Sequence, residues 1–551
     1  MSLSIHLSRL ENHDLSQEYA CLNALQRTAW RINTDVLSTL RHLWDSGQSW
    51  GKLPARDDLP LPSYPFDKDP KEMTEAEMEE FKKWSRSRNQ IYSFNAKSVS
   101  KRIQVERTLQ VAQAYAKHDD LYYVWQNDFR GRKYPSATFL SPQSADWSKA
   151  LLEFANPVPI NTWDDARWLC IHGANLYGND KVSLDNRELW AWEFAEMWAH
   201  RVVSNPYEVL IWTEADKPYQ FLAWCYEMSG LLKDGWGFQS RLPVSADGSC
   251  NGLQHLSAIL RDERGGRTTN LIPSDVPQDI YTEVAEAATR LINEDTTDLE
   301  LRGKCLEFGI DRKLTKRPVM IVPYSGTRHA CRDYIHEAIA DKIEEGAEDI
   351  FGDGGFKASH YLSGHVWTAI SDVIQSARKV MDYIKDVGDV YSEHNTHMEW
   401  VTPTGWLVLQ DYNNTEAKRI KTHINGSILK MSYLQDIEGS VNKRRTGLGS
   451  SPNFIHSLDA AALTRTVNRC KVLGIKDFAM VHDSYGTHSS FMPMMSDILR
   501  QEFVNMYEEH NVLTELRDHA ILTLGTDDVP EPPSVGNLDL QNVLKSQYFF
   551  A

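Results

Sequence analysis

The sequence of 551 residues lacks paired cysteines and long apolar runs. Its seven cysteines are scattered, and no two of them form a Cys-x-x-Cys pair. This pattern is typical of a reducing compartment and provides no zinc site. No stretch of about eighteen apolar residues is present, so we expect no membrane-spanning helix. The segment from Met1 to Asp14 has no apolar core like that of a signal peptide, which predicts a cytoplasmic protein.

An excess of positive charge is also absent. The net charge is −17 at pH 7, from 76 acidic and 59 basic residues. A protein that coats nucleic acid non-specifically needs a cationic surface, so the composition disfavours that class. An enzyme that acts on nucleic acid is still allowed, because a local basic channel matters more than the total charge. The length suffices for a large core divided into several subdomains.

Two carboxylates stand where short apolar runs end. Residues 242–246 form such a run, followed by Asp247, a glycine-containing turn and leucines at helical spacing. A single aspartate in this setting is more often a turn or helix-capping residue. However, Asp483 has a matching place, at the tip of a hairpin predicted over 478–487. Two carboxylates at strand ends can hold two hard cations and leave room for phosphate and water.

A third informative stretch carries cations at helical spacing. Arg312 and Lys316 are four residues apart and would share one face of a helix, which Tyr324 follows. Two cations and a tyrosine on one face could hold a triphosphate at one end and a sugar or base at the other. Pro318 and Pro323 are expected to kink or interrupt this helix.

Two basic clusters are candidates for nucleic-acid binding. Arg130 and Arg132 flank a glycine between two aromatic residues, which suits a loop that grips phosphates, although a plain basic turn is an equal alternative. Lys443 and Arg444 belong to the second cluster. His456 follows on a predicted helix that begins at Ser451-Pro452, where a histidine is more often structural than functional.

The remaining pattern is mostly helical. Apolar spacing predicts one helix over 16–44, and charged helices over 72–93 and 95–116. A hairpin is predicted over 398–410, and the alternating stretch 418–433 suggests a second hairpin or ribbon.

Five motifs, taken in order, resemble the single-subunit RNA polymerases of bacteriophages and mitochondria. They are DFRGRKY (128–134), DGSCNGLQHLSA (247–258), RKLTKRPVM with the following tyrosine (312–324), SPNFIHS (451–457) and VHDSYGTH (481–488). The ending SQYFFA (546–551) is similar to the aromatic tail of the phage members. The resemblance extends from about Cys21 to Ala551 and implies DNA-templated RNA synthesis from ribonucleoside triphosphates.

The resemblance implies a role for the acidic and basic residues of the predicted site. Asp247 and Asp483 would hold two Mg²⁺ ions, one near the attacking RNA 3′-hydroxyl and one near the leaving pyrophosphate. Lys316 would lie by the transferring phosphate and Arg312 by the outer phosphates.

It also implies contacts to sugar and nucleic acid. Tyr324 would close over the incoming sugar, and His456 would hydrogen-bond the 2′-hydroxyl of a ribonucleotide. Arg130 and Arg132 would contact nucleic acid near the active site. Ser325 departs from the family, which usually has glycine directly after the tyrosine.

The fold implied is a mainly helical α+β right hand with an antiparallel palm sheet. The predicted divisions are an amino-terminal remnant with the thumb (1–120), the first part of the palm (121–275), the fingers (276–395), and the second part of the palm with a specificity-type hairpin and the tail (396–551). About 120 residues precede the predicted palm, so we expect the family's large promoter domain to be missing.

The expected function is therefore that of a phage-encoded RNA polymerase in an infected bacterial cell. It would use a DNA template, nascent RNA and ribonucleoside triphosphates. Initiation would depend on a melted template, a separate promoter-melting subunit or a single-strand DNA-binding protein. The alternatives are a primase-like or DNA polymerase-like enzyme, and a catalytically inactive polymerase-shaped protein that binds nucleic acid.

Overall fold

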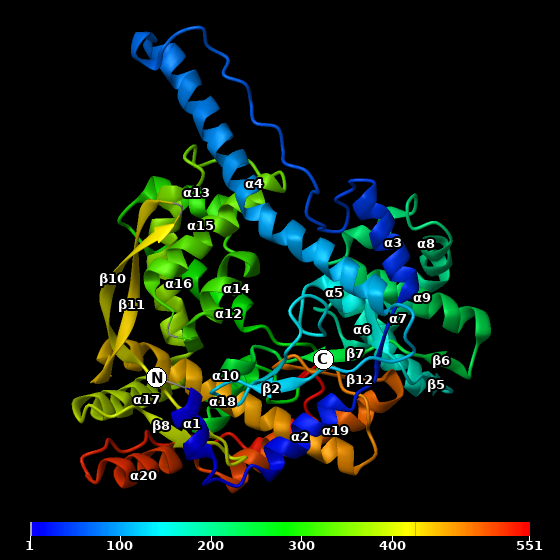
Figure 1. The fold of residues 1–551 in the computed structure, drawn as a ribbon, viewed down its shortest axis with the longest axis vertical. Helices are drawn as coiled ribbons and strands as arrows, with labels where there is room; N and C mark the ends of the chain where they lie inside the picture. Colours follow the sequence, from blue (N-terminus) through cyan, green and yellow to red (C-terminus); the bar gives the residue numbers. More distant parts are fainter. Residues whose placement is uncertain (1–2, 325, 425) are drawn as a thin grey trace.

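Helices dominate the computed structural model, which describes residues 3–324, 326–424 and 426–551 (Figure 1). Within these ranges the strands form small antiparallel sheets of two strands each. The expectation of a mainly helical α+β protein is confirmed at this level. No helix in the described ranges combines the length and the apolar character that crossing a bilayer requires.

The amino-terminal part differs from the predicted helices. It contains α1 (Leu3–Leu10), α2 (Ser16–Gln26), β1 (Trp30–Ile32), α3 (Thr34–Asp45), the 3-10 turn η1 (Pro70–Glu72) and α4 (Glu75–Tyr115). The single helix predicted over 16–44 is wrong, because β1 interrupts it and pairs with residues 152–154. The two helices predicted over 72–116 are one, α4, which begins with a capping box between Thr74 and Glu77. Figure 1 shows α4 projecting from the body of the molecule.

The next part carries the first predicted carboxylate. Its elements are β2 (Trp125–Asn127), β3 (Lys133–Pro135), α5 (Asp146–Ala150), β4 (Leu152–Phe154), β5 (Val158–Ile160), α6 (Trp163–Tyr177), α7 (Leu184–Phe194), the π-helical η2 (Ala195–Ala199), α8 (His200–Ser204), the 3-10 turn η3 (Leu210–Glu214), α9 (Pro218–Asp234), β6 (Phe238–Ser240), β7 (Val244–Asp247) and α10 (Asn251–Leu260). Helices α6 and α9 pack closely because Gly173 lies against Trp224, where a Cβ atom would approach within 2.2 Å of the indole ring.

A helical part follows. It consists of α11 (Glu263–Thr268), α12 (Ile280–Glu294), α13 (Leu299–Phe308), α14 (Arg312–Met320), η4 (Val322–Tyr324), α15 (Arg328–Glu344), α16 (Phe356–Val373) and α17 (Gln375–Glu393). Helices α12, α14, α15 and α16 pack against one another. The predicted interruption is confirmed only in part: α14 runs through Pro318 and ends at Met320, two residues before η4 begins.

The last part returns the chain to β7. It contains β8 (Glu399–Val401), β9 (Leu407–Leu409), β10 (Asn413–Ile424), β11 (Ser427–Val441), α18 (Lys443–Val472), β12 (Ser484–Thr487), η5 (Ser489–Phe491), α19 (Met492–Glu509), α20 (Val512–Leu524) and η6 (Leu540–Lys545). The predicted hairpin is β8–β9 and the predicted ribbon is β10–β11. The helix expected to begin at Ser451 begins instead at Lys443, capped by Asn442, and Pro452 lies within it. Helix α18 packs against α2, α10, α17 and α19 and forms the centre of the core.

Candidate active site

The two predicted carboxylates meet in the middle of the molecule. Strand β7 pairs with β12 in antiparallel fashion, and Asp247 lies opposite Ser484 (Figure 1). Because Asp483 directly precedes β12, the pairing places it beside Asp247, and Gly248 donates a hydrogen bond to its carbonyl oxygen at 3.1 Å. The predicted strand-end position of both residues is confirmed.

A tight hairpin presents Asp483. The backbone groups of Val481 and Ser484 exchange two hydrogen bonds of 2.9 Å, so only His482 and Asp483 form the turn. His482 has a φ of 53°, the left-handed conformation that such two-residue turns require. The turn therefore defines the backbone position from which the Asp483 side chain extends.

The two carboxylates have opposite pKa shifts. The pKa of Asp483 is raised to about 6, first by burial and then by the negative charges of Asp459 and Asp247. Burial also acts to raise the pKa of Asp247, but Lys217 and a hydrogen bond from Ser484 outweigh it, so the net shift is downward. Asp247 is surrounded by protein but lines the cavity, and 56% of its side-chain surface is accessible from that space, so a ligand can reach it.

The predicted phosphate-binding cations line the same cavity, which has a volume of about 520 Å³ and also contains Asp247 and Asp483. The Arg312 guanidinium donates to Asp279 at 2.7 Å and lies 5.2 Å from the ring centre of Tyr281. Lys316 lies one turn further along α14, and its pKa is lowered by partial burial and by the Arg312 charge.

The predicted sugar-contacting residue follows this helix. Tyr324 ends η4, while its side chain lies outside the part of the molecule that the structure describes. Ser325 also lies outside the described residues. Their predicted contribution to sugar selection stays a prediction.

Sequence reasoning missed a second group of cations. It lines the same cavity as the α14 side chains and comprises Lys149, Lys181, Arg187 and Lys217. These residues lie in separate segments between α5 and α9, with no local motif around them. They come together only because α7 and α9 pack against α6 and α6 packs against β7, so no local signal in the sequence marks them.

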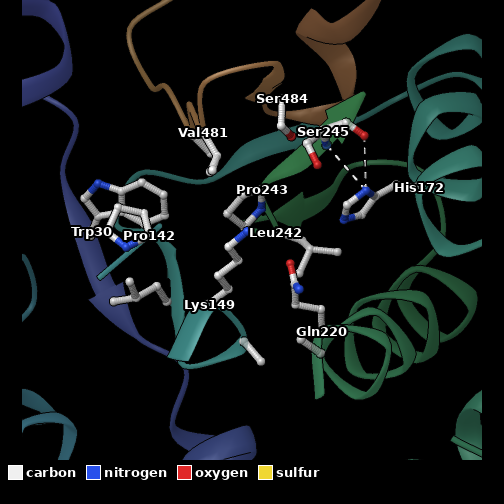
Figure 2. Close-up of a pocket in the computed structure, with 14 residues that line it drawn as sticks. Trp30, Pro142, Lys149, His172, Gln220, Leu242, Pro243, Ser245, Val481 and Ser484 are labelled. Atoms are coloured by element: carbon white, nitrogen blue, oxygen red, sulfur yellow. Dashed lines mark hydrogen bonds between the residues drawn. The ribbon is translucent and has the colours of Figure 1, made fainter. Parts of the chain in front are cut away.

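A small side pocket of about 60 Å³ adjoins the main cavity (Figure 2). Lys149 and Gln220 line both spaces. His172 is buried at its edge, and its Nδ1 lies 3.3 Å from the carbonyl oxygen of Ser245, as Figure 2 shows. Burial and the charge of Lys217 lower the pKa of His172 to about 4, so this ring is neutral at physiological pH.

Arg130, Arg132 and His456 form one network beside the site. Arg130 pairs with Asp128 at 2.7 Å and also contacts Nδ1 of His456 at 2.8 Å. A guanidinium can only donate, so this imidazole nitrogen accepts. Burial, followed by the charges of Arg132 and Arg130, lowers the pKa of His456 to about 2. Arg132 pairs with the buried Asp459. The two arginines thus organise the site from within, and their contact with nucleic acid stays a prediction.

The second basic cluster begins α18. Lys443 pairs with Glu393 of α17 at 3.1 Å, whereas Arg444 is exposed. Arg445 lies over the ring of Tyr412. Among the described residues, the cavity lining does not include this cluster.

The donor set suits hard cations that also bind phosphate. In the described ranges, no three His, Cys, Asp or Glu side chains gather closely enough to form a metal site of their own. Asp247 and Asp483 instead provide carboxylate oxygens in a cavity that several cations also line. Such oxygens fit Mg²⁺, which keeps waters and takes further ligands from phosphates.

The sequence shares similarity with known polymerases over nearly its whole length. T7 RNA polymerase of Escherichia phage T7 is 31% identical over 601 residues, covering 99% of this chain and 66% of that protein. The mitochondrial DNA-directed RNA polymerase 1 of Arabidopsis thaliana is 32% identical over 560 residues, covering 99% of this chain and 55% of that protein. The chain thus spans between about half and two thirds of these relatives. The sequence profile of DNA-dependent RNA polymerases matches residues 162–528, and the chain belongs to this family.

Proposed function

We propose that the chain synthesises RNA on a DNA template from ribonucleoside triphosphates. Each step would join the RNA 3′-oxygen to the α-phosphorus of a nucleotide and release pyrophosphate. The observation that carries this proposal is the single cavity that gathers Asp247, Asp483, Arg312 and Lys316 from distant parts of the chain. Two carboxylates facing several cations form a site for a metal-bound polyphosphate.

The carboxylates would hold two divalent cations, for which Mg²⁺ is our expectation. Bound there, these ions would activate the 3′-hydroxyl and stabilise the leaving pyrophosphate. Asp247 and Asp483 provide the oxygen ligands, and the pairing of β7 with β12 keeps them in place. The hydrogen-bonded turn of His482 and Asp483 defines the backbone position from which the Asp483 carboxylate extends.

The cations of α14 would bind the triphosphate. Lys316 is placed to contact the transferring phosphate, and Arg312 the outer phosphates. Arg312 is already oriented by Asp279 and Tyr281, so little conformational freedom is lost when a phosphate binds. Ordered donors of this kind stabilise charge that develops on the leaving group.

Sugar choice would depend on Tyr324 and His456. The contact between Arg130 and His456 supports this role, because it fixes the orientation of the imidazole ring. Contacts to template and product would come from Arg130, Arg132, Lys443 and Arg444, and from the β10–β11 ribbon.

We further propose the right-hand arrangement of palm (121–275 and 396–551), fingers (276–395) and thumb (within 1–120). The packed helices α12, α14, α15 and α16 support the fingers, and the projecting α4 supports the thumb. Relatives from phages support a phage origin, with action in an infected bacterial cell. Promoter melting would come from a partner subunit or a single-strand DNA-binding protein.

A primer-extension assay tests this function. The purified chain is given a primed DNA template, Mg²⁺, and either ribonucleotides or deoxynucleotides. We expect template-directed extension with ribonucleotides. Preferential extension with deoxynucleotides would instead indicate a DNA polymerase-like enzyme. Template binding without extension by either set would indicate an inactive binding protein.

A further inference from the structure

Asp247 has a counter-ion within the protein. Lys217 Nζ lies 3.5 Å from Asp247 Oδ2, and the two side chains are 45% and 56% exposed. Both residues line the catalytic cavity, so the ion pair faces the space that a substrate would fill. An ammonium therefore stands where a metal ion would approach this carboxylate.

The backbone of Lys217 is held firmly while its side chain is long. Its amide donates to the carbonyl oxygen of Leu176 at 3.0 Å. Pro218, the first residue of α9, disfavours the helical conformation for the preceding residue, and Lys217 is non-helical, with φ −120° and ψ 76°. The four-carbon side chain keeps its rotational freedom, so the ammonium can move although its attachment point cannot.

We propose that Lys217 is a positioning residue that balances the charge of Asp247 in the empty site and moves to the triphosphate when a nucleotide enters. The inference deepens the proposed function and rests on it. The metal cation and the nucleotide would then bind cooperatively. The nucleotide would draw the Lys217 ammonium away from Asp247, and the ammonium would no longer compete with the metal for that carboxylate. The exchange breaks no covalent bond and transfers no proton.

The charges around the cavity support this exchange. Lys149 lies close enough to Lys217 and Asp247 to interact with both electrostatically, and Arg312 and Lys316 line the same cavity. A triphosphate in this cavity would meet several cations. Lys217 would then exchange one carboxylate for several phosphate oxygens. Since the ion pair is partly solvated, we expect it to weaken metal binding to the empty site by about 3- to 10-fold.

Binding of Mn²⁺ to the full chain without nucleotide is the direct test, with free Mn²⁺ measured by electron paramagnetic resonance. Lys217→Met removes the charge and keeps the length of the side chain, and should tighten Mn²⁺ binding about 3- to 10-fold. Lys217→Arg should restore the wild-type affinity. Lys233→Ala removes a lysine near the other end of the same helix and should leave the affinity unchanged.

Two further measurements separate a direct effect from a structural one. In an Asp247→Asn background, Lys217→Met should tighten Mn²⁺ binding by less than twofold, because the carboxylate is gone. A non-hydrolysable ribonucleoside triphosphate should strengthen Mn²⁺ binding more in the wild type than in Lys217→Met. These expectations concern binding and do not require turnover.

Unchanged or weakened Mn²⁺ binding in a folded Lys217→Met protein, with the wild-type thermal transition, would overturn the inference. The inference would also be overturned if Lys217→Met tightened Mn²⁺ binding equally in the wild-type and the Asp247→Asn backgrounds. The primer-extension assay reports separately on the proposed function. If the wild type does not extend primers but the Mn²⁺ shifts appear, the ion exchange stands and the polymerase assignment fails. If the wild type extends primers but the changes in Mn²⁺ binding are absent, the polymerase assignment stands and the ion exchange fails.

Discussion

At the scale of single residues, Asp247 and Asp483 test the proposed chemistry most directly. Replacing either by asparagine keeps the size and removes the charge, and a neutral amide is a poor ligand for Mg²⁺. We expect nucleotide incorporation to fall at least about a hundredfold in Asp247→Asn and in Asp483→Asn. Template affinity, measured by fluorescence anisotropy, should change little. Asp234→Asn, at the end of α9, serves as the matched control, and substantial incorporation by either site variant would contradict the two-cation assignment.

Sugar choice is a second property that single residues decide. Losing one hydrogen bond to the ribose removes roughly 1–3 kcal/mol of discrimination. Tyr324→Phe and His456→Ala should therefore accept deoxynucleotides more readily, with ribonucleotide incorporation only moderately reduced. The measurement is the ratio of kcat/KM for the two nucleotide types. Ratios equal to the wild type in both variants would remove these residues from sugar recognition.

A buried histidine also makes stability depend on pH. His255 is 1% exposed, and burial lowers its pKa to about 3. The imidazole of His255 binds a proton near pH 6.5 in the unfolded chain but only near pH 3 in the folded chain. The free energy of unfolding is therefore highest above pH 6.5 and falls as the pH is lowered from 6.5 towards 3. The loss can reach about 5 kcal/mol. His255→Gln should reduce the slope of the thermal-unfolding midpoint against pH between 4 and 6.5, and the slope that stays would come from other buried histidines such as His172. The exposed control His423→Gln should keep the wild-type slope.

At the scale of elements, the pairing of β7 with β12 leaves no room for a side chain at Gly486. A Cβ atom there would lie 2.8 Å from the carbonyl oxygen of Ala479 and 3.2 Å from Cβ of Ser245. We expect Gly486→Ala to cost about 1–3 kcal/mol of stability and to reduce activity by shifting Asp483. Gly303 on α13 has open space around it, and Gly303→Ala should leave activity unchanged and raise stability by about 1 kcal/mol, because alanine is the better helix former. Calorimetry and primer extension measure the two effects.

The elements also show how far the sequence could predict the structure. The turn at Asp483 and the β10–β11 ribbon were predictable because their patterns are local. Strand β1 was not, since Ala29 and Ile32 continue the apolar helical spacing of the neighbouring segments, while the pairing of Trp30 with Phe154 depends on distant residues. The place of Lys217 in the cavity could not be predicted either, because only the fold brings it close to its partner Asp247.

At the scale of the whole molecule, the negative net charge limits the general affinity of the chain for DNA. Opening a promoter costs roughly 1.4 kcal/mol for each base-pair step. A chain with a net charge of −17 gains little from general attraction to phosphate to offset this cost. We expect the purified chain to transcribe single-stranded and premelted templates well, and relaxed duplex DNA poorly. Run-off transcription on the three templates measures this, and efficient, start-site-specific transcription of the relaxed duplex would contradict it.

The pairing of β7 with β12 also has a consequence for the synthesis of the protein on the ribosome. The ribosome adds about 5–20 residues per second, so on the order of ten to fifty seconds separate the synthesis of Asp247 from that of Asp483. During that interval the nascent chain holds only one carboxylate of the pair, because β7 has no β12 with which to pair. Under the proposed function, the chain would be inactive while it is being made. A message broken between the two codons would yield a fragment that lacks the proposed site.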